Sequence, residues 1–332
     1  MLDSAIISQY KYEEMRVSKT SFYALIYSVI AFVLSLQLLP YYISGDQGHY
    51  REFYESCFYD GSRLEDEIFC YSNTLGSTEP IYFFISKFVH PFLDKDIYIS
   101  LVNAILVFLI TVLTFKYYKQ KLTRHIFLLF IFSNYYLVVL MLAAERLKFG
   151  FLVLTLALLL TGTKRLIGLG TSMLTHTQMA LMIAPLYISK ILKEDVKLWK
   201  KIAVAVICLV GFAGVFYLLR EQITSKFEIY ANNTEDSGTG ITGALKTSVF
   251  VILSFISTRQ FALFIAGMPL IALAYFLGAD RIGMLAFILY AAAVVFYKGK
   301  ADLFLYFVML YFSYKSIHFI LNVIKYGNGY VG

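Results

Sequence analysis

The sequence is poor in charged residues. Asp, Glu, Lys and Arg together make up 15% of its 332 residues, whereas soluble globular domains carry about 25%. Hydrophobic residues reach 59%, which exceeds the roughly 45–50% of soluble domains. This composition excludes an ordinary soluble enzyme. It predicts an all-α, polytopic integral membrane protein built as a helical bundle.

Motifs for cofactors and metals are also absent. There is no Walker A, G-x-G-x-x-G or G-x-S-x-G pattern, and no Cys/His cluster has zinc spacing. The D-K-D stretch at 94–96 is attributed to a helix start, where acidic residues are favourable anyway. The sequence therefore predicts an activity that uses neither a metal nor a cofactor.

The basic residues define a topology. The net charge of +7 calls for no nucleic-acid partner, because most Lys and Arg fall in a few short loops, as the positive-inside rule expects. Lys11, Arg16 and Lys19 place the N-terminus in the cytoplasm. The loop 44–95 then lies outside, and the lysine-rich stretch 190–201 lies inside.

Apolar runs predict about ten membrane helices in a single transmembrane domain, 1–332. A span needs about 20 apolar residues. The predicted spans are 22–42, 97–116, 125–143, 147–162, 202–220, 261–279, 282–298 and 302–321. The polar stretch 221–244 is predicted as a second external loop. We place 245–258 in the interface, because 14 residues are too few to cross the membrane.

Residues 166–189 are an exception to full-length spans. Basic residues place both ends of this stretch in the cytoplasm, yet two full spans need about 40 residues. We therefore predict a short re-entrant hairpin whose turn falls at 175–177, with His176 at its apex. Irregular backbone at membrane depth is tolerated inside protein or against a water-filled cavity. The hairpin thus predicts a cavity open to the outer side.

The chain has three cysteines. Cys208 falls within a predicted span and is attributed to the core. Cys57 and Cys70 fall in the first external loop, where an oxidising periplasm permits a disulfide. Two free thiols remain the alternative, because sequence does not give their separation.

Two ionisable residues at predicted membrane depth are candidates for function. Arg146 can grip a phosphate with two parallel hydrogen bonds, and Gly150 one turn later allows close approach. The alternatives for Arg146 are lipid headgroups or a pair with Glu145. His176 has the near-neutral pKa of a general base. Its alternative is a hydrogen bond inside the bundle, to a neighbour such as Thr175.

The first external loop holds further candidates. Asp46, Tyr50 and Tyr54 recur every four residues and share one helix face, from which Asp46 can act as a base or bind sugar hydroxyls. Arg51 can meet a second phosphate. The alternative for these residues is an amphipathic helix lying on the membrane.

Two candidates stand at predicted helix boundaries. Glu79 precedes Pro80, so it either orients an acceptor or merely begins a helix. Arg259 interrupts apolar sequence between two helices and is a candidate second phosphate ligand.

Several of these stretches resemble the EpsG/Wzy-type polysaccharide polymerases. The resemblance lies in the order of "GDQGHYREFY", "EPIYFFISKF", "ERLKFG" and "LTHTQMALMIAPLYI", over about residues 40–190. The matching positions are Asp46, Tyr50, Tyr54, Glu79, Pro80, Arg146, Gly150, His176 and Pro185. Ile81 and Leu147 depart from the pattern, because the family often has Gly and Gln there.

The resemblance implies a metal-independent glycosyltransferase in the bacterial inner membrane, with its active site facing the periplasm. Its substrates would be undecaprenyl-pyrophosphate-linked oligosaccharide repeat units, polymerised into O-antigen or a related polysaccharide. Membrane lipids and a chain-length regulator protein are the further partners implied. Arg146 with Arg259 or Arg51 would bind the pyrophosphate, and His176, Asp46 or Glu79 would take the proton of the attacking hydroxyl.

Other membrane functions remain as alternatives. An O-antigen ligase or an O-acyltransferase also needs an outward site, a base and a cation. A lipid-linked oligosaccharide flippase should show internal repeats and midplane charges, and the sequence has neither.

Overall fold

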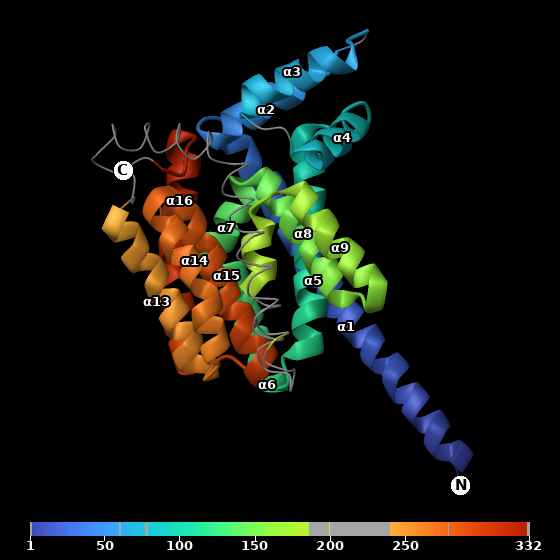
Figure 1. Ribbon diagram of the computed structural model, residues 1–332. Coiled ribbons are helices and arrows are strands. Elements are labelled where there is room, and N and C mark those ends of the chain that lie inside the picture. Colours follow the sequence, from blue (N-terminus) through green and yellow to red (C-terminus); the bar gives the residue numbers. More distant parts are fainter. Residues whose placement is uncertain are drawn as a thin grey trace. The chain divides into compact units, whose positions relative to one another are not determined.

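The computed structural model describes residues 2–59, 61–76, 79–185, 199, 240–277 and 279–330, shown in Figure 1. Within these ranges every regular element is a helix and none is a strand, as predicted. The contacts divide the chain into two compact units. Unit 1 comprises residues 1–179 with 308–332, and unit 2 comprises residues 180–307.

Two long helices form the spine of unit 1. The second half of α1 (Leu2–Leu38) packs against α5 (Lys95–Tyr117). Asn103 Nδ2 of α5 donates a hydrogen bond to Ser35 Oγ of α1 at 2.9 Å. The rest of α1 from residue 22 onward presents exposed apolar side chains, including Phe22, Leu25 and Val29. Such a face suits contact with lipid.

The predicted external loop 44–95 is itself helical. After the short 3₁₀ turn η1 (Leu39–Tyr41) it holds α2 (Asp46–Ser56), α3 (Leu64–Leu75) and α4 (Pro80–Val89). Pro80 occupies the first turn of α4, where its missing N–H costs nothing. Aromatic rings hold the three helices together, with Phe53 of α2 5.0 Å from Tyr71 of α3 and 5.7 Å from Tyr82 of α4 between ring centroids.

The predicted span 125–143 is broken in two. α6 (Lys121–Phe132) and α7 (Tyr135–Leu142) meet at an angle of 54°. At the break, the Asn134 side chain caps α7 by accepting a hydrogen bond from the Tyr136 N–H. α16 (Leu303–Tyr326) supports the same break, because Ser316 Oγ donates to the Ser133 carbonyl at 2.6 Å.

The turn after α16 closes onto the start of the loop helices. The carbonyl of Gly327 accepts hydrogen bonds from the backbone N–H groups of Ile43 and Ser44, at 3.1 and 3.0 Å. Ser44 Oγ donates to the same oxygen at 3.0 Å. Gly327 has φ +70°, a conformation that glycine adopts readily.

α8 (Glu145–Leu159) and α9 (Gly162–Thr175) form a helical hairpin, side by side in Figure 1. A Cβ at Gly168 of α9 would lie 2.8 Å from Ala157 Cβ, so the two helices approach closely. α9 ends at Thr175 and a further helical segment begins at Met179. The predicted turn at 175–177 is therefore confirmed, while its re-entrant character stays a prediction.

Unit 2 contains α13 (Gly240–Thr258), α14 (Phe261–Leu277) and α15 (Ala279–Lys298), which pack against one another. α13 begins at Gly240, inside the loop predicted for 221–244, and reaches 19 residues. It is long and apolar enough to span. The argument that only 14 residues were available for a span at 245–258 was therefore wrong.

Five helices in the described part of the chain are long and apolar enough to cross a membrane, or six if the bent pair α6–α7 counts as one span. They indicate a helical membrane protein. The five are Lys19–Tyr41, Lys95–Tyr117, Gly240–Thr258, Arg281–Lys298 and Leu303–Tyr326. α8, with 15 residues, is not among them, although we predicted a span at 147–162. The predicted span 202–220 and the loop 221–239 lie outside the described residues, so a total of about ten stays a prediction.

Candidate functional site

One carboxylate joins the two strongest sequence candidates. Glu79 Oε2 accepts a hydrogen bond from Arg146 Nη1 at 3.3 Å, and Glu79 Oε1 contacts His176 Nδ1. The three side chains come from three separate parts of unit 1: the residue before α4, the first turn of α8 and the end of α9. They are 12–16% exposed. The cluster is thus mostly enclosed but still open to a ligand.

Arg146 is positioned by the start of α8. Its expected alternative partner, Glu145, is instead 2.7 Å from Lys95 Nζ and faces away into the protein interior. The Nε of Arg146 is buried and has no hydrogen-bond partner among the residues described, whereas the side chain as a whole is 16% exposed. The N-terminus of a helix adds a partial positive charge beside this guanidinium. The arrangement suits an anion.

His176 is positioned by the turn that ends α9. Its backbone is extended, with φ −156° and ψ 118°. A Cβ at Gly150 of α8 would lie 3.1 Å from His176 Cβ and 2.7 Å from Met179 Cγ. Gly150 therefore permits the close approach of the His176 turn, and close approach of a phosphate to Arg146 stays a prediction. Thr175, a suggested alternative partner for His176, bonds the Thr171 carbonyl instead.

Tyr50 extends the cluster onto α2. It is 8% exposed. Burial raises its pKa, the charge of Arg146 lowers it, and the charges of Glu145 and Asp46 raise it again. The net direction is upward, so Tyr50 keeps its hydroxyl proton at neutral pH. Asp46 stands at the first turn of α2, where its negative charge favours the helix.

Tyr54 shares the face of α2 with Tyr50 but has a different environment. Its hydroxyl donates to the Leu93 carbonyl at 2.7 Å, and its ring lies 5.1 Å from His90 and 5.9 Å from Tyr98. Burial raises the pKa of Tyr54 to about 12. Tyr54 therefore packs the loop helices against the start of α5.

Of the two further candidate arginines, Arg51 has partners elsewhere in unit 1 and Arg259 belongs to unit 2. Arg51 Nη2 donates to Asp96 at 2.8 Å and to the Leu39 carbonyl at 2.8 Å, which ties α2 to α5. These contacts argue against Arg51 as a phosphate ligand, because its fork is already occupied within the fold. Arg259 belongs to unit 2, where it is exposed between α13 and α14 with φ 58°.

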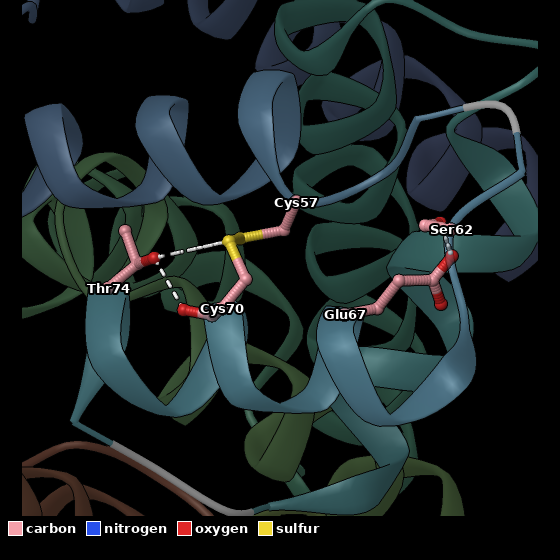
Figure 2. Close-up of a disulfide and its surroundings, with 5 residues drawn as sticks. All are labelled: Cys57, Ser62, Glu67, Cys70 and Thr74. Atoms are coloured by element: carbon pink, nitrogen blue, oxygen red, sulfur yellow. Dashed lines mark hydrogen bonds between the residues drawn. A yellow bond between two sulfur atoms is a disulfide. The ribbon is translucent and has the colours of Figure 1, made fainter.

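Cys57 and Cys70 form a disulfide, with 5.6 Å between their Cα atoms. It joins the end of α2 to the middle of α3, as Figure 2 shows. The predicted bridge is confirmed and the alternative of two free thiols is wrong. Cys208 lies outside the described residues.

Sequence reasoning missed a buried polar network beside the cluster. Glu145 Oε1 accepts hydrogen bonds from Lys95 Nζ at 2.7 Å and from Gln47 Nε2 at 2.9 Å, and Tyr82 donates to Oε2 at 2.8 Å. We had treated Glu145 as a possible partner of Arg146 and had not considered Lys95 or Gln47. The one available signal was charge, because Lys95 and Glu145 border apolar helices.

The cluster combines a base and a cation. With Nδ1 of His176 facing a carboxylate, Nε2 is the nitrogen that remains to take a proton. Arg146 offers a fixed positive charge close by. Among the described residues, no group of three or more His, Cys, Asp and Glu side chains is arranged to hold a metal ion. No protein-family model, curated protein or solved structure matches the chain.

Proposed function

We propose that this protein is an inner-membrane glycosyltransferase of bacteria. It polymerises undecaprenyl-pyrophosphate-linked oligosaccharide repeat units into O-antigen or a related polysaccharide on the periplasmic face. The observation that carries the proposal is the bridge from Glu79 to both Arg146 and His176. This bridge gathers a proton acceptor and a cation, which a transfer from a pyrophosphate donor requires.

Arg146 is the donor-binding residue in this proposal. The leaving pyrophosphate gains charge as the glycosidic bond breaks, and a preorganised guanidinium stabilises that charge. The adjacent N-terminus of α8 favours the same ligand chemistry. Tyr50 contributes a protonated hydroxyl beside the guanidinium.

His176 is the general base. The oxygen of the acceptor hydroxyl forms a bond to the anomeric carbon of the donor, while the bond from that carbon to the pyrophosphate oxygen breaks and its electron pair leaves with the pyrophosphate. The hydroxyl proton passes to Nε2 of His176. Glu79 holds the other ring nitrogen and stabilises the imidazolium that results, as the carboxylate does in other His–acid pairs.

The disulfide supports the proposed side of the membrane. Disulfides persist in oxidising compartments such as the periplasm, and the bridge lies in the segment that supplies Tyr50 and Glu79. The basic residues before α1 favour the same orientation, with the N-terminus in the cytoplasm.

The first test is the surface-glycan profile of a strain lacking the gene, resolved by gel electrophoresis. We expect core capped with only a single repeat unit, because flipping and ligation still work when polymerisation fails. Complementation with the wild-type gene should restore the ladder. An unchanged ladder with altered modification would instead identify a decorating transferase, and uncapped core would identify a flippase or ligase; either result overturns the proposal.

A further inference from the structure

The missed polar network is almost fully buried. Its four members are Gln47, Tyr82, Lys95 and Glu145, which we call the platform network, and none is more than 3% exposed. Lys95 Nζ also donates to Gln47 Oε1 at 2.6 Å, so the amide and the ion pair form a closed ring of contacts. Four helices therefore meet at one carboxylate: α2, α4, α5 and α8.

Each network member on α2, α4 and α8 lies within three positions, along the chain, of a residue of the candidate site. Gln47 is three residues before Tyr50 on α2, and Tyr82 is three residues after Glu79 at the start of α4. Glu145 directly precedes Arg146 on α8. Residues three apart lie on neighbouring positions of one helix face. Fixing the network side chains therefore fixes the backbone from which the site side chains project.

Two more contacts fix the end of α7, one from the first turn of α8 and one from α2. Lys148 is fully buried, and its Nζ donates to the Met141 carbonyl at 2.6 Å. Gln47 Nε2 also donates to the Leu142 carbonyl at 2.5 Å. Carbonyls at a helix end lack partners within the helix, so these donors satisfy groups that burial would otherwise penalise. The start of α8 is thus held on both sides of Arg146.

Stability alone does not account for such a network. Removing two charges from water is costly, and well-packed apolar residues in place of a buried ion pair are often equally or more stabilising. Directional hydrogen bonds instead define one arrangement of the elements that carry them. We infer that the platform network positions Tyr50, Glu79 and Arg146 for transfer without touching the substrate. This inference rests on the proposed function.

Tyr82→Phe is the variant that separates positioning from folding. It removes one hydroxyl from Glu145 and leaves the ring of Tyr82 and the Lys95–Glu145 pair in place. Tyr118→Phe is the matched control. Tyr118 is also a buried tyrosine, and its hydroxyl contacts Thr123 at 2.9 Å, at the opposite end of the 23-residue helix α5 from Lys95.

The first readout needs no substrate. Protein with ¹⁵N-labelled histidine, purified in detergent, should show a downfield Nδ1 proton resonance for His176, assigned by its loss in His176→Gln. We expect Tyr82→Phe to shift or broaden this resonance, because Glu79 is no longer fixed, while Tyr118→Phe leaves it unchanged. Tyr82→Phe should lose more thermal stability than Tyr118→Phe, because the hydroxyl of Tyr82 bonds a carboxylate and that of Tyr118 bonds a neutral hydroxyl. An unchanged His176 resonance in Tyr82→Phe would overturn the inference.

The second readout is transfer of repeat units by the same preparations. Misplacement of reacting groups lowers turnover, so we expect kcat to fall about tenfold or more in Tyr82→Phe with KM for the lipid-linked unit little changed. Equal kcat in Tyr82→Phe and Tyr118→Phe would overturn the inference. If wild-type protein transfers no repeat unit while the His176 resonance responds as expected, the positioning network stands and the proposed function fails.

Should Tyr82→Phe prove unstable, the double variant Lys95→Met with Glu145→Leu provides a second test. It replaces the whole ion pair by apolar groups of similar volume, a change that is often neutral in comparable sites, and it also removes the partner of the Tyr82 hydroxyl and two partners of the Gln47 amide. A folded double variant with a wild-type His176 resonance would contradict the positioning role. A folded double variant with an altered resonance would support it.

Discussion

Glu79 and His176 lie 97 residues apart in the chain, yet a carboxylate oxygen of one contacts Nδ1 of the other. The second oxygen of the same carboxylate bonds Arg146. A single acidic residue thus sets both the tautomer of the candidate base and the orientation of the candidate cation. Substitutions of Glu79, Arg146 and His176, alone and combined, therefore test what each residue contributes.

Arg146→Lys should impair polymerisation although it keeps the charge. Lysine lacks the planar fork that binds a phosphate through two parallel hydrogen bonds. We expect a loss of about 10²-fold in turnover, comparable with the removal of one preorganised donor. The measurement is the chain-length ladder of complemented cells, followed by transfer assays on purified protein.

Arg51→Lys is the control for that variant. Arg51 has a similar side-chain exposure, 20% against 16%, but its guanidinium binds Asp96. Its replacement should leave the ladder close to normal at equal protein level. Normal polymer length with Arg146→Lys, or equal loss in both variants, would contradict the assignment of Arg146 to the donor pyrophosphate.

Glu79→Gln and His176→Gln should act as one unit. Each single variant breaks the His176–carboxylate pair, so the double variant should be scarcely worse than either single one. We expect each single loss to lie in the range of about 10²–10⁴-fold, as for other general bases. Transfer rates of the four proteins in a double-mutant cycle provide the check. Multiplicative losses would show that Glu79 and His176 act independently.

Gly150→Ala should displace the His176 turn. The added methyl would lie 2.7 Å from Met179 Cγ and 3.1 Å from His176 Cβ, and overpacking of this kind costs about 1–3 kcal/mol. Thermal unfolding and transfer rate should both decline. Gly170→Ala on α9 is the matched control, because a Cβ there meets nothing within 4 Å. If the two alanine variants behave alike, Gly150 does not position His176.

The disulfide gives a direct test of topology. In intact cells carrying Cys208→Ser, a membrane-impermeant maleimide should label Cys57 and Cys70 only after reduction. Cys57→Ser with Cys70→Ser should lower the free energy of unfolding by about 3 kcal/mol, as expected for a short loop. A gel shift after labelling and thermal unfolding measure the two effects. Labelling that requires opening the inner membrane would place this segment in the cytoplasm.

Much of the site follows from local sequence. Arg146 and His176 stand out because charge is rare near apolar segments, and Gly150 stands out by its spacing from Arg146. Cys57 and Cys70 stand out because they share a polar loop. These residues can be recognised from the residues that surround them in the sequence.

The sequence did not predict which residues far apart in the chain form ion pairs. Arg51 binds Asp96 and Lys95 binds Glu145, at separations of 45 and 50 residues. Hydropathy gives the length of a helix but not the neighbour it packs against, so nothing in the sequence distinguished Arg51 as a tether from Arg146 as a site residue. The prediction that 245–258 does not span failed for a related reason, because the Gly-rich stretch from Gly240 to Gly243 begins the helix before its main apolar run.

The hydrogen bonds from α16 and Gly327 constrain when unit 1 is completed during biosynthesis. Ser316 satisfies the broken helix at Ser133, and Gly327 anchors the entrance to α2, but the ribosome makes both after all of unit 2. During synthesis, the segments that carry Tyr50 and Arg146 therefore lack the contacts from Ser316 and Gly327 until these residues have been made. A nascent chain stopped before residue 308 would present Tyr50 and Arg146 on an unfinished scaffold, so unit 1 is completed only after all of unit 2 has been synthesised.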